Sequence, residues 1–481
     1  MKQTEWKIIY TSYEGVAKRA INLLSKEAGK YIIRENGVYR IYVLPCEKEG
    51  CAISKNAFLV GCYNESKMIQ KYVDSGEVPE DGFLVKIVPN PDDSSGRFVI
   101  LTAHTEQELF YSVVNFLDDY LPNFRPNDGC NPTPDFAFDY DHILREYSHA
   151  ETPDFKTRSI FTWGHSINDY RSYIDNMART KFNELIIWND YIPLNISEII
   201  DYAHSYGIKV VLGYSWGWDT ADVGVDVTEE SLDKIKEQAI RQYREEYIKT
   251  NCDGIYFQTF TERQEDRIGG KLIAEVVIDM VNEVAEKLWE ITPDLRLLFG
   301  LHATSVKNRL DCISKVDSRI ELYWEDCGDF PYNYNTNIKS EEAYEETMEF
   351  TKKLLELRGG KGVVLVFKGV MMLDWFRFVH QSGPFVMGEN SPLVAAHDKG
   401  IRANSWRVFS AEWIKNGKYV ARMLRFIKEN KLGDVTMCLA GTFDGGIYLP
   451  MAICGQMFRS ADGDYDEIVS KVARRSCITV D

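Results

Sequence analysis

Three acidic residues follow apolar runs of the sequence and have the side chains needed for acid/base chemistry. Glu262 stands a few residues after the run Gly254–Phe257, and the adjacent Glu325 and Asp326 come directly after a second such run. Cleavage of a glycosidic bond needs two carboxyl groups across the bond: one donates a proton to the leaving oxygen, and the other activates water or attacks the anomeric carbon. We therefore take Glu262 as a candidate general acid and Glu325 or Asp326 as a candidate base. One such acid alone could equally be a solvated group at the end of a strand.

Tryptophans and polar side chains follow other apolar runs in the same way. Sugar rings stack their C–H faces on aromatic rings, and their hydroxyl groups form directional hydrogen bonds with Asn, His, Asp and Lys side chains. A single tryptophan is more often part of a core, but six of the chain's ten tryptophans belong to this set. Lys368 could bind a substrate carboxylate or form a salt bridge with Glu325. The pattern predicts a carbohydrate site with the substrate-binding candidates Trp163, His165, Trp188, Asn189, Trp216, Trp218, His302, Trp324, Lys368 and Trp406.

The elements that would position these residues are short apolar runs separated by amphipathic stretches, beginning near residue 158. Alternation of this kind predicts parallel strands joined by crossover helices. Eight such strands close into a (β/α)₈ barrel, in which functional residues lie at the C-terminal strand ends. Helices are expected at 411–430 and 464–474, packed on the outside. The predicted strands are Ser159–Trp163, Glu184–Trp188, Lys209–Tyr214, Gly254–Phe257, Arg296–Leu301, Arg319–Trp324, Gly362–Phe367 and Gly400–Asn404.

The first 125 residues predict a separate α/β domain, because strand-like and helix-like patterns alternate there. The polar, proline-rich segment Pro122–Pro134 indicates a linker. We therefore expect an N-terminal α/β sandwich domain at 1–125, a linker at 126–157, and a catalytic TIM barrel with C-terminal helices at 158–481. In the first domain the expected strands are Trp6–Thr11, Val38–Leu44, Ala57–Val60, Phe83–Val88 and Phe98–Thr102, and the expected helices are Glu14–Lys30, Asn64–Asp74 and Thr105–Tyr120.

Composition narrows the class of partner. The chain has 481 residues, 44% of them hydrophobic, and a formal net charge of -17, which argues against nucleic acid or an anionic membrane surface as a partner. No apolar run reaches the length of a signal peptide or a membrane helix. Ten cysteines without CxxC pairs predict reduced thiols in a cytoplasmic protein, unless an export signal has been removed. No metal or dinucleotide motif is present, so we expect no metal and no cofactor. An oligosaccharide substrate is the expected partner, and a homodimer stays open.

Several segments resemble β-N-acetylhexosaminidases and α-glucuronidases, in which a small α/β domain precedes a barrel. In residues 1–125 the matching parts are the near-terminal strand and helix, the segment Asp81–Leu84 (DGFL), and the strand followed by Thr105–Leu121. In the barrel, residues 192–218 (IPLNISEIIDYAHSYGIKVVLGYSWGW) are similar to the second-helix and third-strand segment of hexosaminidases. Arg158 opens the first strand as an arginine does in that family, and this resemblance implies that Arg158 binds substrate.

The fourth strand departs from the hexosaminidase pattern. Those enzymes carry an adjacent Asp–Glu pair there, whereas this chain has Thr261-Glu262, which looks more like the Ser–Glu of α-glucuronidases. The resemblance implies a general-acid role for Glu262 in an inverting mechanism, although Arg263 stands where the glucuronidases have glycine. We expect an exo-acting, inverting glycoside hydrolase for a hexosaminide or a substrate containing uronic acid. The alternatives are a non-catalytic carbohydrate-binding barrel protein and a barrel enzyme of other chemistry, such as a lyase or isomerase.

Overall fold

The computed structural model describes residues 6–32, 43–53, 55–124, 145–217, 228–260, 267–268, 270–301, 309–325, 341–368, 383–430, 434–441 and 448–476. The chain divides into two compact units. The first comprises Met1–Pro153, Ser205–Gly207 and Asp466–Asp481, and the second comprises Asp154–His204 and Ile208–Tyr465.

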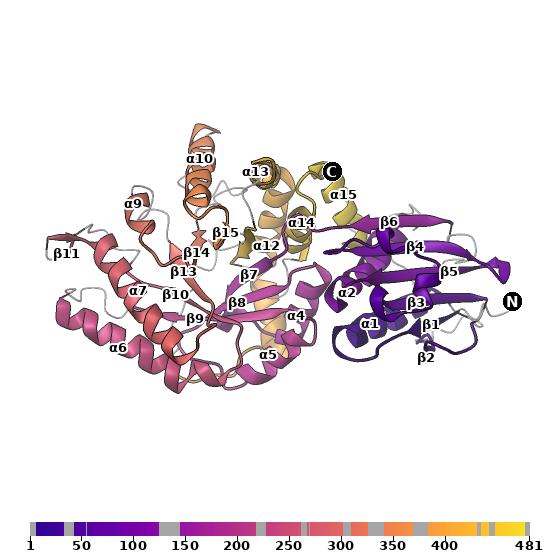
Figure 1. Cartoon of the computed structure of the whole chain (residues 1–481), viewed down its shortest axis with the longest axis horizontal. Coiled ribbons are helices and arrows are strands. Elements are labelled where there is room, and N and C mark those ends of the chain that lie inside the picture. Colours follow the sequence, from indigo (N-terminus) through magenta and orange to yellow (C-terminus); the bar gives the residue numbers. More distant parts are fainter. Residues whose placement is uncertain are drawn as a thin grey trace. The chain divides into compact units, whose positions relative to one another are not determined.

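The first unit is built on a mixed sheet of six strands (Figure 1). These strands are β1 (Trp6–Tyr10), β2 (Cys46–Lys48), β3 (Asn56–Cys62), β4 (Phe83–Asn90), β5 (Asp93–Ala103) and β6 (Tyr147–Glu151). Their order in the sheet is β2-β1-β3-β5-β4-β6. The first four of these run parallel to one another, and β4 is antiparallel to both β5 and β6.

Both faces of this sheet are covered, because successive side chains of a strand point to opposite sides. The helices α1 (Gly15–Ile32) and α2 (Glu106–Asn115) pack against each other and against the sheet (Figure 1). Ile9, Leu59 and Ile100 form a separate buried cluster with Ile69 and Val73, which come from the segment between β3 and β4. The α/β sandwich class predicted for the N-terminal region is therefore confirmed.

Local elements of this unit differ from the prediction at several points. Residues 64–74 contain two short 3₁₀ turns, η1 (Tyr63–Glu65) and η2 (Ile69–Lys71), rather than one helix. The Ser66 hydroxyl accepts a hydrogen bond from the Ile69 amide at 3.1 Å, a local bond that competes with helix formation. Strand β2 was not predicted, and most of the strand predicted at 38–44 lies outside the described residues.

Two further elements join the first unit from unexpected parts of the sequence. Strand β6 lies inside the stretch expected to be a linker, and its mixed composition, YSHAE, gave no strong strand signal. The last helix, α15 (Tyr465–Ser476), was expected on the outside of the barrel, but most of it belongs to the first unit. Its Lys471 and Arg475 form ion pairs with the buried carboxylate of Asp119.

The second unit is a closed barrel of eight parallel strands, as predicted (Figure 1). The strands are β7 (Arg158–Trp163), β8 (Glu184–Trp188), β9 (Lys209–Ser215), β10 (Gly254–Gln258), β13 (Leu297–Leu301), β14 (Ile320–Trp324), β15 (Val363–Lys368) and β16 (Thr436–Ala440). They follow one another around the barrel in this order, and β16 pairs with β7 to close it. The helices of this unit include α4 (Tyr170–Arg179), α5 (Ile196–His204), α6 (Glu229–Glu245), α7 (Ile273–Ile291), α10 (Glu341–Leu357), α13 (Lys418–Glu429) and α14 (Tyr448–Arg459).

The eighth strand is not where the sequence analysis put it. Residues 400–404 are helical, inside α12 (Pro392–Asn416), and the eighth strand is β16. The Ser391 hydroxyl accepts a hydrogen bond from the Val394 amide at 3.3 Å and Pro392 occupies the first turn, so a helix start precedes this region. The glycine at 400 lowers the local helix propensity without ending the helix.

Alternation along the strands separates the barrel interior from the layer between the sheet and the helices. Phe161, Tyr256 and Tyr323 point inward and meet, with ring centroids 5.1, 5.6 and 4.8 Å apart. Phe257 and Phe299 point outward and stack on each other with centroids 5.2 Å apart. On each strand, a residue two positions from an inward residue also points inward, and its immediate neighbours point outward.

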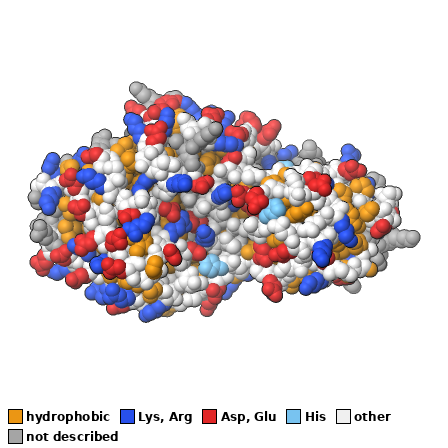
Figure 2. Space-filling model, viewed as in Figure 1, with side chains coloured by type: hydrophobic (Ala, Val, Ile, Leu, Met, Phe, Trp, Pro, Cys, Tyr) orange, Lys and Arg blue, Asp and Glu red, His pale blue; other side chains and the backbone are white. Residues whose placement is uncertain are grey.

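Acidic and basic side chains are intermixed on the face of the molecule that Figure 2 shows. In the described part of the chain, no helix combines the length and the apolar character that crossing a bilayer requires.

Candidate functional site

The candidate site residues predicted from the sequence fall into three groups. Nine have side chains that the structure describes. Lys368 is the last residue of β15, but its side chain is outside the described set. Trp218, Glu262, His302 and Asp326 lie outside the described residues altogether.

Glu325 is the candidate catalytic carboxylate that the structure describes at this end of the barrel. It follows directly on β14 and is only 8% exposed. Its Oε1 accepts a hydrogen bond from the Tyr256 hydroxyl at 3.0 Å and another from the Gln258 side-chain amide at 2.9 Å. The same amide nitrogen lies 2.6 Å from the Tyr256 oxygen. The three side chains thus form a closed triangle of hydrogen bonds inside the mouth.

The local sequence explains why these groups meet. In β10, GIYFQ, the inward positions are Gly254, Tyr256 and Gln258. Strand β13 lies between β10 and β14, and its inward residue near them is Gly300. A methyl group at position 300 would overlap the Tyr256 hydroxyl and lie 2.8 Å from Gln258 Cγ. Because residue 300 has no side chain, Tyr256 and Gln258 of β10 have the space to reach Glu325.

Tyr256 can donate a hydrogen bond to Glu325 without losing its proton. Complete burial raises the pKa of Tyr256 well above its ordinary value of 10, and the negative charge of Glu325 raises it further. The phenol therefore stays protonated throughout the neutral range. Sequence reasoning missed Tyr256 and Gln258, although alternation from Gly254 would have marked both as inward residues.

The ends of β7 and β8 bring four more candidates to the mouth. Trp163 and Trp188 are paired in register on neighbouring strands. Trp188 packs edge-on against Tyr256 with centroids 5.5 Å apart, so these indoles extend the aromatic interior towards the C-terminal end of the barrel. His165 follows in the turn η6 (Gly164–Ser166) and is half-buried. Asn189 follows β8 at the same end.

Asn189 is buried to 95%, and its side-chain oxygen has no hydrogen-bond partner among the described residues. This oxygen packs over Gly164, where a methyl group would overlap it and would lie 2.7 Å from Met387 Sδ. A buried amide oxygen without a donor costs about 1–3 kcal/mol. This feature supports the predicted polar contact with a ligand at Asn189.

Three tryptophans of the candidate set pack against other parts of the protein. Trp216 is fully buried and stacks on Phe257, with centroids 3.6 Å apart and an interplanar angle of 7°. Trp324, also fully buried, lies against Phe350 of α10 with centroids 4.9 Å apart. Both point outward from the barrel, because Phe257 is an outward residue and Trp324 is adjacent to the inward Tyr323. Trp406 is buried within helix α12 and is not at a strand end.

Arg158 occupies the opposite end of the barrel from the mouth. It is the first residue of β7, and its buried guanidinium donates to the backbone carbonyls of Phe155, Lys156 and Lys181 at 2.7–2.8 Å. These bonds hold the chain where it enters the first strand. The substrate contact that the family resemblance implied would have to be made at the other end of the strand.

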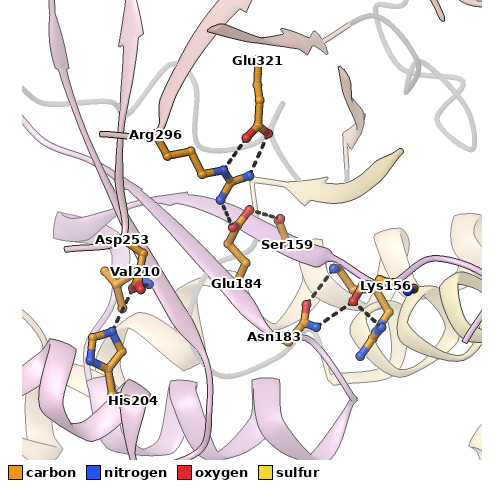
Figure 3. A network of polar contacts seen from close by, with 10 residues as sticks. Lys156, Ser159, Asn183, Glu184, His204, Val210, Asp253, Arg296 and Glu321 are labelled. Carbon is orange, nitrogen blue, oxygen red and sulfur yellow. Dashed lines mark hydrogen bonds and ion pairs between the residues drawn. The ribbon is translucent and has the colours of Figure 1, made fainter. Parts of the chain in front are cut away.

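A second buried carboxylate network lies at this N-terminal end (Figure 3). Arg296 forms ion pairs with Glu184 and Glu321, and Ser159 donates to Glu184 at 2.6 Å. Glu184 is completely buried. Burial acts to lower the pKa of Arg296, but the two carboxylates outweigh it and raise that pKa above its ordinary value. The positive charge of Arg296 therefore balances the acids of this layer.

No metal site is visible in the part of the chain that the structure describes, where no three His, Cys, Asp or Glu side chains come together to hold an ion. Asp169, an acid close to His165 in the sequence, caps helix α4. Its carboxylate accepts hydrogen bonds from the amides of Arg171 and Ser172 at 3.0 and 3.1 Å.

Neither a protein-family model nor a curated protein matches this chain. Among solved structures, it is similar to a family GH115 4-O-methyl-α-glucuronidase with specificity for decorated arabinogalactans, at 11% identity and a TM-score of 0.50 over 96% of this chain and 57% of that one. It also matches the GH20 β-N-acetylhexosaminidase of Streptomyces coelicolor A3(2), at 11% identity and a TM-score of 0.49 over 98% and 91% of the two chains. A third match, CpGH84D, has 14% identity and a TM-score of 0.45 over 76% and 57%.

The chain thus spans less than two thirds of the length of the GH115 enzyme and of CpGH84D. The resemblance to α-glucuronidases predicted from the sequence is confirmed for the fold by the match at a TM-score of 0.50, and at 11% identity the likeness is one of fold.

Proposed function

We propose that this chain is a glycoside hydrolase that cleaves a glycosidic bond in an oligosaccharide by general acid/base catalysis. The observation that supports this most is the buried carboxylate of Glu325 at the mouth of a parallel barrel, held by Tyr256 and Gln258. In such barrels the catalytic groups lie at this end of the strands. A carboxylate fixed as a hydrogen-bond acceptor can take a proton from water or attack an anomeric carbon.

The proposed partner of Glu325 is Glu262, as general acid, with Asp326 as the second choice of base. Glu262 follows β10 in sequence, and one strand separates β10 from β14 around the barrel. Residues at such positions face each other across part of the mouth, which favours the wider carboxyl separation of inverting enzymes, about 6.5–9.5 Å. We therefore propose inversion at the anomeric carbon.

The proposed substrate is a hexosaminide or a sugar containing uronic acid, cleaved from the end of an oligosaccharide. Trp163, Trp188, Asn189 and His165 lie at the same end of the barrel as Glu325 and offer apolar and polar contacts to a sugar ring. Lys368 ends β15 and is the proposed contact for a substrate carboxylate.

A panel of aryl glycosides that includes hexosaminides and glucuronides tests the activity. Glu325→Gln should lower kcat by about 10²–10⁴-fold on any substrate that the wild type hydrolyses. The matched control is Glu290→Gln, an exposed acid on α7, which should leave kcat unchanged. Equal rates for wild type and Glu325→Gln would contradict the proposal. Sugar binding in calorimetry without turnover would support the non-catalytic carbohydrate-binding barrel instead.

Two further measurements test the mechanism. Glu262→Gln should slow cleavage of substrates with poor leaving groups far more than that of aryl glycosides with very good ones, because the latter need little protonation. Equal losses would mean that Glu262 only positions the sugar. Proton NMR of the first-formed product should show the anomer opposite to that of the substrate, and retention would make Glu325 a nucleophile.

A further inference from the structure

We infer that Tyr256, supported by Gln258 and by the missing side chain at Gly300, is a positioning residue that holds Glu325 as the base of the reaction; this inference rests on the function proposed above. It gives a role to two polar side chains that lie deeper in the barrel than the residues expected to touch the sugar. This role follows from where the two hydrogen bonds end, which atoms donate them, and what surrounds the donors.

Both hydrogen bonds end on the same carboxylate oxygen. Tyr256 and Gln258 each donate to Oε1 of Glu325, from 3.0 and 2.9 Å. Two donors on one oxygen fix the rotation of the carboxyl group as well as its position. The direction in which Oε2 points is thereby defined, which a base needs if it is to meet a water molecule at hydrogen-bond distance.

The donors give the two oxygens of Glu325 different roles. A side-chain amide nitrogen has hydrogens and no lone pair to accept with, and a phenol that is already accepting from that amide donates onward. Gln258 therefore donates both to Tyr256 and to Glu325, and Tyr256 donates to Glu325. Two donors aimed at Oε1 make that oxygen an acceptor, so a proton that Glu325 takes up as a base goes to Oε2.

The surroundings keep the donors in place. Tyr256 is fully buried, and its ring contacts those of Phe161, Trp188 and Tyr323, with centroids 4.8–5.5 Å apart. The ring can therefore stay in position when the hydroxyl alone is removed. Gly300 allows the hydroxyl to approach, since a methyl group there would overlap it.

The test compares Tyr256→Phe with Tyr323→Phe. Tyr323 is an equally buried tyrosine in the same interior cluster, and its hydroxyl lies 3.4 Å from Cys438 Sγ. On an aryl glycoside that the wild type hydrolyses, Tyr256→Phe should lower kcat by about 10- to 100-fold with KM changed less than threefold, the effect expected of a misplaced reacting group. Tyr323→Phe should leave kcat within twofold. Equal kcat values for the two variants, or a loss confined to KM, would overturn the inference.

Crystal structures of the same proteins make the test independent of activity. Glu325 should adopt one side-chain conformation in the wild type and in Tyr323→Phe, and a different or a second conformation in Tyr256→Phe. An unchanged carboxylate in Tyr256→Phe would overturn the positioning role even if activity fell. If no glycoside is hydrolysed by the wild type, the proposed function fails, and the conformation of Glu325 still decides whether Tyr256 positions it.

Discussion

The two ends of the barrel each contain a buried inward-facing glutamate, but the groups that hold them differ. At the N-terminal end Glu184 is paired with the guanidinium of Arg296, which also binds Glu321. At the C-terminal end Glu325 accepts hydrogen bonds from a neutral phenol and a neutral amide. A carboxylate bound to arginine has its charge balanced and its lone pairs occupied. The phenol and the amide position Glu325 without themselves balancing its charge.

This difference follows from what a buried charge requires. A carboxylate loses several kcal/mol of hydration on burial, and an ion pair returns that energy only with good geometry and further hydrogen bonds. Arg296 meets these conditions because it bonds to both acids. Its Nη2 donates a hydrogen bond to Glu321 Oε2 at 2.8 Å. The N-terminal layer is therefore expected to govern stability, and the mouth to govern activity.

The largest effect is expected from Arg296→Met. This change leaves the fully buried Glu184 without its guanidinium partner, so the free energy of unfolding should fall by about 3–5 kcal/mol. Urea unfolding at pH 7 measures it. The control is Lys287→Met, which removes an exposed pair with Glu290 and should change stability by less than about 1 kcal/mol. A small loss of stability together with a large loss of activity would remove the distinction between the two ends.

The next effect concerns Trp324, which the sequence analysis had assigned to substrate binding. Because its indole is buried against Phe350, Trp324→Ala should lower the free energy of unfolding by about 3 kcal/mol through loss of packing. KM for any substrate should change little in the fraction of protein that stays folded. A raised KM with an unchanged melting temperature would instead restore the role of sugar platform.

Trp324 and Glu325 also show how far the sequence could lead. The apolar runs identified most barrel strands, since a buried parallel strand is apolar on both faces. That same property hides which residues point inward, so Trp324 and Glu325 were both assigned to the mouth although neighbours on a strand face opposite sides. Alternation alone would have separated them. The eighth strand, TMCLA, was missed because a short apolar run has no periodicity that distinguishes it from a buried helix.

The sequence of a single strand is not enough to predict the hydrogen-bond triangle at the mouth. Glu325 was predicted because an acid after an apolar run is visible in the sequence. Its contact with Gln258 depends on β13 lying between their strands and on Gly300 occupying the inward position there. Register and neighbour order come from closure of the whole barrel, and no local pattern in the sequence encodes them.

A smaller effect is expected from Gly300→Ala, which tests whether the mouth depends on space at this position. The added methyl group would overlap the Tyr256 hydroxyl, and overpacking of this kind costs about 1–3 kcal/mol. Activity should fall together with stability, because the side chains that hold Glu325 must move. The control is Gly400→Ala on α12, where nothing lies within 4 Å, and there stability should be unchanged or slightly higher. Full activity in Gly300→Ala would show that Glu325 does not need this arrangement.

The smallest effect is a loss of stability in alkali from the tyrosines below the mouth. Burial raises the pKa of Tyr256 and of Tyr323 well above 10, and neighbouring groups, including the Glu325 charge, raise both further. In the unfolded chain these phenols ionise near pH 10, whereas in the folded chain they stay neutral. A raised folded-state pKa means that their contribution to stability is complete below pH 10 and declines as the pH rises above it.

The double variant Tyr256→Phe/Tyr323→Phe should therefore lose less stability between pH 9 and pH 11 than the wild type. Each tyrosine that stays neutral only when folded contributes a slope of at most about 1.4 kcal/mol per pH unit above pH 10. Tyr214 and Tyr247 are equally buried and remain in both proteins, so the wild type and the variant should both lose stability, the variant with the shallower slope. Urea unfolding at several pH values gives the two slopes. Parallel slopes would mean that the phenols ionise in the folded barrel, and Tyr256 could not then remain a neutral donor to Glu325 in alkali.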